Sequence, residues 1–176
     1  MRDRTIGWIL LACSVLGCAA AVMLLVEQAA ELGTCDLNPF ISCGSVLDSP
    51  QAEILGFANP FMAMATQPVV AAIGMCLIMG ATLPRWVWWG LNAGAATGAA
   101  LVHWFIYESL YVLHTLCPYC VLTWVVTITI FWYVTARNLG GRMLRYHSTG
   151  LALWLLAIAG LVVHAFWRQW PAMFST

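Results

Sequence analysis

The chain has 176 residues, of which 62% are hydrophobic and 8% are charged. A soluble domain of average composition carries about 25% charged residues, so this sequence cannot cover a water-facing surface. Seven Arg and no Lys balance seven acidic residues, and this zero net charge indicates no particular partner. The composition predicts an integral membrane protein and excludes an ordinary soluble enzyme, a nucleic-acid-binding protein and a disordered scaffold.

Five apolar segments are long enough to cross a bilayer as helices, which takes about 20 residues. They are residues 7–26, 61–83, 86–107, 116–136 and 150–167. A backbone in lipid must satisfy its own hydrogen bonds, and no period-two alternation indicates a barrel. We therefore expect an all-α membrane protein with one domain over residues 1–176, whose first segment is an uncleaved anchor because its apolar run is too long for a signal peptide. On the third segment, Gly90, Gly94 and Gly98 form the small-residue pattern of closely packed membrane helices.

The orientation follows from the Arg residues, because positive charge stays on the cytoplasmic side of a membrane. Six of the seven lie before the first segment, between the second and third, or after the fourth: Arg2, Arg4, Arg85, Arg137, Arg142 and Arg145. With five spans these regions share one side. The pattern predicts a multi-pass protein of the cytoplasmic membrane with its N-terminus inside, its C-terminus outside and residues 31–60 as an outer loop.

Four cysteines lie on the predicted outer side, where disulfides can persist. Cys35 and Cys43 are in the outer loop, and Cys117 and Cys120 belong to a Cys-Pro-Tyr-Cys element at the start of the fourth helix. Pro118 suits the first position of a helix, which makes Cys117 the residue that caps it. The positive end of the helix dipole stabilises a thiolate at this position. Cys120 lies one turn deeper on the same face, so it can face a lipid-soluble electron acceptor.

Other interpretations of these cysteines are a purely structural disulfide and a zinc site with four thiolates. Zinc sites usually repeat short Cys-x2-Cys spacings, and Cys-x7-Cys is not one of them, so we expect no metal. Three further cysteines, Cys13, Cys18 and Cys76, lie within spans and are interpreted as small hydrophobic residues. His114 could assist proton transfer or steady a thiolate, although a solvated surface histidine is the commoner case.

Several segments together resemble the vitamin K epoxide reductase family, most closely its bacterial members. They are residues 35–46 (CDLNPFISCGSV), 48–50 (DSP), 59–61 (NPF) and 117–120 (CPYC), in the family's order and over most of the chain. The resemblance implies a four-helix bundle around a quinone, either menaquinone or ubiquinone. It also implies that residues 150–167 form a peripheral fifth transmembrane helix.

The resemblance assigns a role to each of the four cysteines. It implies that Cys117 and Cys120 form the active-site pair, with Cys120 facing the quinone. Cys35 and Cys43 would be the shuttle pair, in which Cys43 exchanges with Cys117 and Cys35 meets the outside thiol. The pairing of the disulfides at rest stays open.

Three further residues are implied in quinone binding. Ser49 matches the loop serine of the family, and Asn59 matches the asparagine that hydrogen-bonds a quinone carbonyl. Trp124 stands one turn after the Cys-x-x-Cys element, where animal members often have Tyr, so a hydroxyl donor is missing there. Many bacterial relatives carry a fused thioredoxin-like domain, for which too little chain follows the last span. The expected partner is therefore a separate exported thiol oxidase, DsbA-like or thioredoxin-like.

The expected function is that of a membrane enzyme that reoxidises this partner and passes the electrons to a quinone, in support of disulfide bond formation. A DsbA couple near −120 mV is strongly oxidising, so a quinone is the plausible final acceptor. One alternative uses the same chemistry to make reduced vitamin K from its epoxide or quinone. A second is a non-enzymatic metal-binding or transport protein with four thiolates, and a third is a carrier of reducing equivalents across the membrane.

Overall fold

The computed structural model describes residues 3–30, 33–36, 40–53 and 56–167. Arg2, the C-terminus and parts of the predicted outer loop (residues 31–32, 37–39 and 54–55) lie outside the described residues. Within these ranges the regular structure is helical, apart from one isolated β-bridge. The elements are α1 (Asp3–Ala30), α2 (Gly44–Leu47), the 3-10 helix η1 (Pro50–Glu53), α3 (Pro60–Ile78), α4 (Arg85–Tyr107), the π-helix η2 (Glu108–Leu113), α5 (Pro118–Leu139), α6 (Gly141–Arg145) and α7 (His147–Phe166).

Each of the five predicted segments forms a long helix, with shifted ends. α1 begins at Asp3, and the carboxylate of Asp3 pairs with the guanidinium of Arg137 at the last turn of α5, at 2.8 Å. α3 ends at Ile78, five residues before the predicted end. The prediction was wrong there because Gly80 adopts a φ of +90°, a left-handed conformation that terminates a helix.

Four of the described helices are long and apolar enough to cross a membrane, namely α1, α3, α5 and α7. α4 is a 23-residue helix but is not among them. Its tryptophans and glycines, together with Asn92 and His103, lower its hydropathy below that of the other four. The structure therefore gives four candidate spans, where the sequence predicted five.

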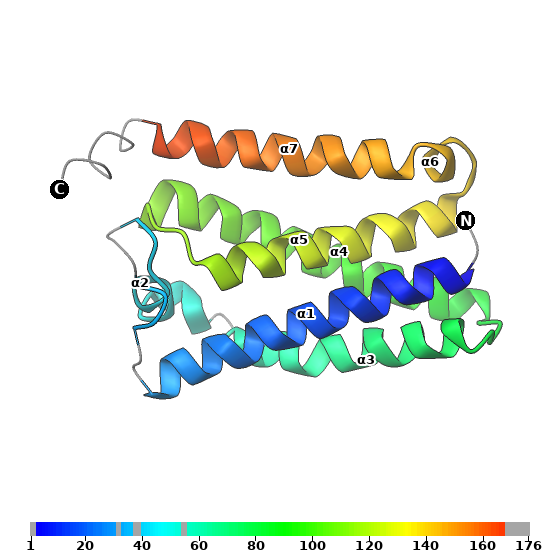
Figure 1. Cartoon of the computed structure of the whole chain (residues 1–176), viewed down its shortest axis with the longest axis horizontal. Helices are drawn as coiled ribbons and strands as arrows, with labels where there is room; N and C mark the ends of the chain where they lie inside the picture. Colours follow the sequence, from blue (N-terminus) through cyan, green and yellow to red (C-terminus); the bar gives the residue numbers. More distant parts are fainter. Residues whose placement is uncertain (1–2, 31–32, 37–39, 54–55, 168–176) are drawn as a thin grey trace.

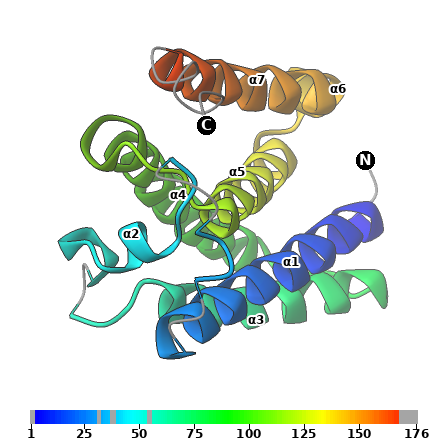
Figure 2. The ribbon, with the colours of Figure 1, turned by 60° about the vertical axis from the view of Figure 1, so that its left-hand side comes forward.

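The long helices alternate in direction along the chain (Figure 1). α1 packs against α3 and α5, and α4 packs against α5. α7 lies on the outside of this group, against α5 and η2 (Figure 2). The alternation brings the end of α1, the segment with α2 and η1, η2 and the start of α5 to one end of the molecule. Both cysteine pairs therefore lie at the same end.

The closest approach between helices is that of α1 and α3. A Cβ atom added to Gly7 would lie 2.7 Å from the carbonyl oxygen of Gly74, and one added to Gly74 would lie 2.9 Å from the carbonyl oxygen of Gly7. Small residues allow such an approach of two backbones. Near this contact Ile6, Leu10 and Leu77 form part of a buried apolar cluster with residues of α4 and α5. This cluster fixes the relative positions of the helices at the end away from the cysteines.

Candidate functional site

Backbone hydrogen bonds hold the first cysteine segment against the start of α5. Ile41 and Leu116 form a parallel β-bridge. The N–H of Leu116 donates to the carbonyl of Phe40 at 2.8 Å, and the N–H of Ser42 donates to the carbonyl of Leu116 at 3.1 Å. Because each cysteine follows directly in sequence, this bridge sets Cys43 beside Cys117.

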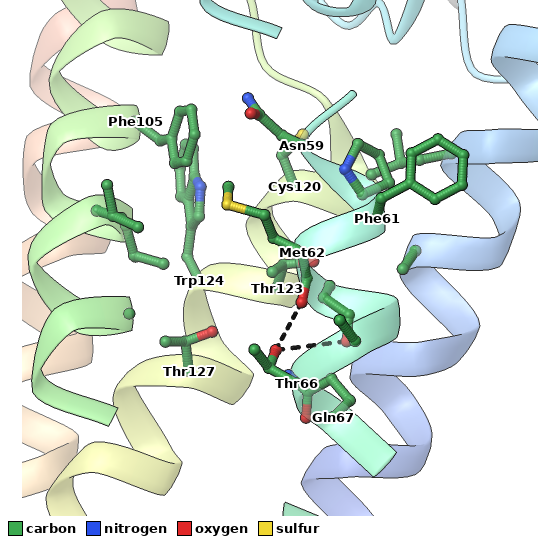
Figure 3. Close-up of a pocket in the computed structure, with 18 of the residues that line it drawn as sticks. Asn59, Phe61, Met62, Thr66, Gln67, Phe105, Cys120, Thr123, Trp124 and Thr127 are labelled. Atoms are coloured by element: carbon green, nitrogen blue, oxygen red, sulfur yellow. Dashed lines mark hydrogen bonds between the residues drawn. The ribbon is translucent and has the colours of Figure 1, made fainter. Parts of the chain in front are cut away.

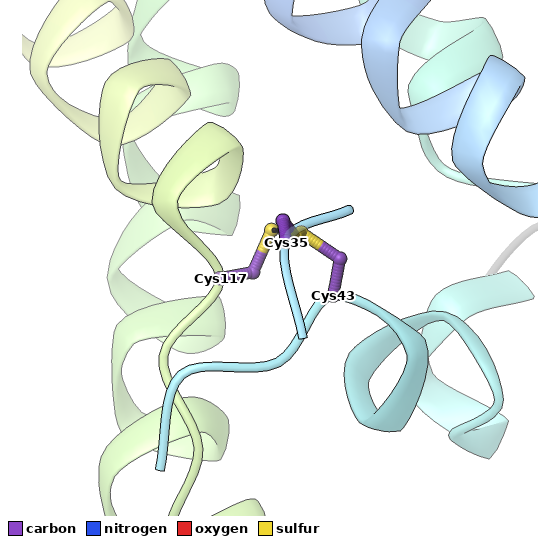
Figure 4. A group of neighbouring side chains, drawn as sticks. All are labelled: Cys35, Cys43 and Cys117. Atoms are coloured by element: carbon purple, nitrogen blue, oxygen red, sulfur yellow. Dashed lines mark hydrogen bonds between the residues drawn. A yellow bond between two sulfur atoms is a disulfide. The ribbon is translucent and has the colours of Figure 1, made fainter. Parts of the chain in front are cut away.

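Three sulfur atoms converge at this point (Figure 4). Cys35 and Cys43 form a disulfide, with their Cα atoms 5.7 Å apart. The Sγ atom of Cys43 lies 3.2 Å from the Sγ atom of Cys117, although the two residues are 74 positions apart. The side chains of Cys35, Cys43 and Cys117 are 7%, 1% and 1% exposed. Thiol–disulfide exchange needs a thiolate in contact with a disulfide sulfur, and this geometry provides that contact.

Cys117 caps α5, as the Cys-Pro-Tyr-Cys element predicts. Pro118 occupies the first turn, and the N–H of Cys120 donates to the Sγ atom of Cys117 at 3.3 Å. The hydrogen bond with the Cys120 side chain, helped by the backbone N–H groups of Cys120 and Tyr119, lowers the pKa of Cys117, although its burial acts in the opposite direction. Cys117 and Cys120 are both free thiols in the described structure. The site is therefore suited to thiol–disulfide exchange between Cys117 and Cys43, in which Cys117 is either the attacking or the leaving thiolate.

Asp36 closes the turn between the disulfide cysteines. The N–H of Gly44 donates to its Oδ1 atom at 3.1 Å. A hydrogen bond from the Ser42 side chain, and then the bond from Gly44, lower the pKa of this exposed carboxyl. Ser42 in turn accepts the N–H of Ser45 at 3.1 Å. The carboxylate and the serines hold the segment that carries Cys43 in one conformation.

A cavity of about 1090 Å³ opens between α1, α3, α4 and α5 and is closed at the cysteine end by the segment with α2 and η1. All three residues that the sequence implied in quinone binding line it: Ser49, Asn59 and Trp124. Cys120 lines it as well, and Figure 3 shows Asn59, Cys120 and Trp124 around the same space. Cys117 does not line this cavity and instead contacts Cys43. The two sulfurs of the Cys-x-x-Cys element therefore face different surroundings.

Polar groups gather at the cysteine end of the cavity. The side-chain amide of Asn59 donates to the backbone carbonyl of Gln51 at 2.7 Å, and the side-chain amide of Gln51 donates to the carboxylate of Glu108 at 3.2 Å. The hydroxyl of Ser49 donates to the carbonyl of Val46 at 2.7 Å. The Oε1 atom of Gln51 is buried without a hydrogen-bond partner among the described residues. The remaining wall is mostly aliphatic and aromatic.

The sequence analysis did not identify three polar residues of this wall: Gln51, Gln67 and Glu108. Gln67 is 6% exposed, and its Oε1 atom has no hydrogen-bond partner in the described part of the chain. A polar residue in an otherwise apolar span, such as Gln67, is a signal that the sequence does contain. His114, by contrast, is exposed, and its ring lies 3.2 Å from the carbonyl of Val112, as expected of a surface histidine.

The glycine pattern of α4 has a different role from the one predicted. A Cβ atom added to Gly90 or Gly94 would meet no described heavy atom within 4 Å, and both residues line the cavity. The interpretation as a packing seam was therefore wrong for these two positions. Only Gly98 approaches a neighbouring helix, since its Cβ would lie 3.2 Å from the methyl group of Thr127. The absent side chains enlarge the cavity.

These features fit a quinone. Ligand sites are typically concave and mostly apolar, with a few polar groups that fix orientation. The apolar walls suit an aromatic ring and a hydrocarbon tail, and the amide of Asn59 lies at the same end as the thiol of Cys120. The buried Oε1 atom of Gln51, without a partner in the described structure, is an acceptor that suits a hydroxyl of the reduced quinone.

A comparison with models of known protein families identifies the family of this chain. The model of the vitamin K epoxide reductase family matches residues 8–135, a range that holds all four outer cysteines together with Ser49, Asn59 and Trp124. No curated protein and no solved structure matches the chain. Members of the matched family are oxidoreductases that couple disulfides to quinones. Since the match covers well over half of the sequence, the chain belongs to the vitamin K epoxide reductase family.

Proposed function

We propose that this enzyme oxidises an exported thiol protein and passes the electrons through two cysteine pairs to a membrane quinone. The observation that carries the proposal is the 3.2 Å contact between the sulfur atoms of Cys43 and Cys117. It joins the Cys35–Cys43 disulfide to the thiol pair whose second member lines the cavity.

The relay begins at the outer pair. A thiolate of a DsbA-like or thioredoxin-like partner attacks the sulfur of Cys35, and Cys43 leaves as a thiolate. Cys43 then attacks Cys117 in an oxidised Cys117–Cys120 pair, and Cys120 leaves as a thiolate beside the cavity. The second thiol of the partner displaces Cys35, which completes the partner's disulfide. Cys35 finally attacks Cys43 and releases Cys117, so that each broken sulfur bond is replaced by a new one.

The arrangement in the structure corresponds to the end of this sequence. Cys35 and Cys43 are bonded again, and Cys117 and Cys120 hold the two electrons as free thiols. A quinone, when bound, supplies an acceptor for two electrons and two protons. Re-formation of the Cys117–Cys120 bond releases that electron pair, and Cys120 is the member of the pair placed at the cavity wall.

We assign the positioning of the quinone to Asn59, Ser49 and Trp124. The amide of Asn59 is a donor suited to a carbonyl oxygen, and the indole of Trp124 offers a flat apolar surface, since its side chain is 4% exposed and lies in the wall. The hydroxyl of Ser49 donates to Val46 in the structure, so its oxygen is left to accept a hydrogen bond from the hydroxyl of the quinol product. Menaquinone and ubiquinone both meet these requirements.

The proposed site of action is the cytoplasmic membrane, with the cysteine end on the exported side. Support for this orientation comes from the positive-inside rule, since the element ends opposite the cysteines (Figure 1) carry Arg4, Arg85, Arg137 and Arg145. We include α4 as a span because it is long enough and packs directly against α5. The proposal thus keeps five spans in one domain, with an inside N-terminus, an outside C-terminus and α7 at the periphery.

The test follows quinone absorbance in detergent, with the purified protein and a reduced DsbA-like protein as electron donor. Cys35→Ala should abolish turnover with the protein donor and retain turnover with a small dithiol, because the dithiol can reach the second pair without the outer exchange. Cys76→Ala, at a free cysteine in α3, is the matched control and should behave as wild type. Equal loss with both donors would contradict the assigned role of Cys35. No turnover by wild type, with zinc or copper bound in stoichiometric amount, would instead favour a metal-binding protein.

A further inference from the structure

Glu108 carries the one carboxyl group among the described residues that line the cavity. Among the described residues that line the cavity, the titratable side chains are Cys120 and Glu108. Glu108 is half-buried at the end of the cavity that is closed by η1. Among the described residues Glu108 forms no ion pair, and its carboxylate accepts a hydrogen bond from the amide of Gln51.

Proton balance requires an acid at this place. A quinone becomes a quinol by taking up two electrons and two protons. The last exchange of the relay releases Cys117 as a thiolate, to which the N–H of Cys120 donates a hydrogen bond, so the reduced pair then carries two electrons and one proton, the proton on Cys120. One proton is therefore missing when the Cys117–Cys120 bond forms.

We propose that Glu108 supplies this proton to the acceptor bound beside Cys120, an inference that rests on the proposed function. In the step, the sulfur of Cys117 bonds to the sulfur of Cys120, and two electrons pass to the acceptor. The proton of Cys120 and the proton of Glu108 go to the two oxygens of the acceptor. Glu108 is left as a carboxylate, which takes up a proton from the aqueous side of the loops before the next turnover.

Hydrogen bonds link Glu108 to the polar end of the cavity. Its Oε2 atom accepts a hydrogen bond from the side-chain amide of Gln51 at 3.2 Å, and the backbone carbonyl of Gln51 accepts one from the side-chain amide of Asn59 at 2.7 Å. The carboxyl group is thus connected through one residue to the amide assigned to a quinone carbonyl. Glu108 is also the first residue of η2. π-Helical turns are rare in proteins, and those that do occur are often found at functional sites.

The backbone after Glu108 is fixed in an unusual path. The hydroxyl of Ser109 donates to the carbonyl of Thr115. His114 adopts a left-handed conformation with a φ of +54°. Since this segment leads directly to Cys117, the acid and the first thiol of the pair belong to the same ten residues.

Other titratable groups are placed elsewhere. Apart from the cysteines, eight other titratable side chains belong to η2 or to the described segments near it. None of these eight lines the cavity: Asp48, Glu53, His103, Tyr107, Tyr111, His114, Tyr119 and His164. Tyr111 and His164 line a separate, smaller surface hollow between η2 and α7. A pH dependence that disappears with the carboxyl of Glu108 can therefore be assigned to it.

The test is a single turnover of enzyme that has been reduced with dithiol, freed of it and mixed with a short-tailed ubiquinone. Glu108→Gln keeps the acceptor for Gln51 but removes the acid, and should slow quinone reduction about 100-fold, as for loss of a general acid. If Glu108 supplies a proton, the wild-type rate should fall with rising pH, whereas the slow rate of the variant should not change over that range. Glu108→Asp should recover part of the rate. Glu53→Gln, an exposed glutamate of η1, is the control and should match wild type.

Two readouts separate this inference from a structural role. The infrared difference spectrum on oxidation of the pair should show loss of a protonated carboxyl band in wild type and in Glu53→Gln, and no such band in Glu108→Gln. Reduction of the Cys35–Cys43 disulfide by dithiol should be equal in all three proteins. A wild-type rate and pH profile in Glu108→Gln would overturn the inference and leave the proposed function intact. Loss of disulfide reduction as well would reveal a structural role and also overturn it, whereas absence of quinone reduction in wild type would overturn the proposed function itself.

Discussion

Replacement of Gly94 by Leu tests whether the cavity of α4 is the acceptor site. A Cβ atom at Gly94 meets no described heavy atom within 4 Å, so the helices need not move, and the added side chain extends into the cavity. The helix itself gains about 1 kcal/mol, because Gly is a poor helix former. A quinone displaced from contact over the area of one leucine side chain loses about 1.5–3 kcal/mol of apolar burial. At 1.4 kcal/mol for each factor of ten, binding should weaken about ten- to 100-fold.

The measurement is the KM for quinone in turnover driven by a small dithiol, together with the rate at which dithiol reduces the Cys35–Cys43 disulfide. Gly94→Leu should raise the KM by that factor and leave disulfide reduction unchanged. Gly160→Leu is the matched control, since Gly160 in α7 is also an open, exposed glycine but does not line the cavity. An unchanged KM in Gly94→Leu, or an equal increase in Gly160→Leu, would refute the assignment of the cavity.

Three further predictions concern the thiols, the loop and the helix contact. Cys117→Ala or Cys120→Ala should abolish quinone reduction with any donor, and full turnover in either variant would contradict the relay. Hydrogen bonds lower the pKa of Asp36, so its carboxylate should stabilise the cysteine loop above the ordinary Asp value of about 3.9, and this stabilisation should be lost as the pH falls through the lowered pKa. Hydrogen exchange of residues 42–47 would detect that loss, which Asp36→Ala should show at neutral pH. Gly7→Ala should lower stability in thermal unfolding by about 1–3 kcal/mol, because its Cβ meets a backbone carbonyl, whereas Gly90→Ala should raise it by about 0.5–1 kcal/mol.

Local features of the sequence were sufficient to predict the long helices and the residue that caps α5. An apolar run that must satisfy its own backbone hydrogen bonds has few alternatives to a helix, and Pro118 marks the first turn after Cys117. The end of α3 was missed because Gly80 could have continued the helix as well as ended it, and only its φ decides. The distribution of the Arg residues was enough to predict that both cysteine pairs lie at the same end of the molecule.

Contacts between segments that are far apart in the chain could not be predicted from the sequence. The bridge of Ile41 with Leu116 is made by backbone atoms, which leave no trace in side-chain pattern, yet it sets the register of the two cysteine segments. The spacing of Gly90 and Gly94 shows that one helix face is smooth, but not whether that face meets another helix or a cavity. Glu108 and Gln51 are 57 residues apart, and neither residue type nor spacing indicated their hydrogen bond.

The separation of the two sulfurs of the Cys-x-x-Cys element explains how one helix turn can couple two different reactions. Cys117 is buried against Cys43, where exchange between pairs takes place, and Cys120 lines the cavity, where the acceptor is proposed to bind. An intramolecular exchange gains most when its reacting atoms are held near contact, and effective molarities for such reactions reach about 10⁵–10⁸ M. Here the contact depends on the two hydrogen bonds of Leu116 with Phe40 and Ser42. The rate of transfer between the pairs should therefore depend on the anchoring of this loop as much as on the chemistry of the thiols.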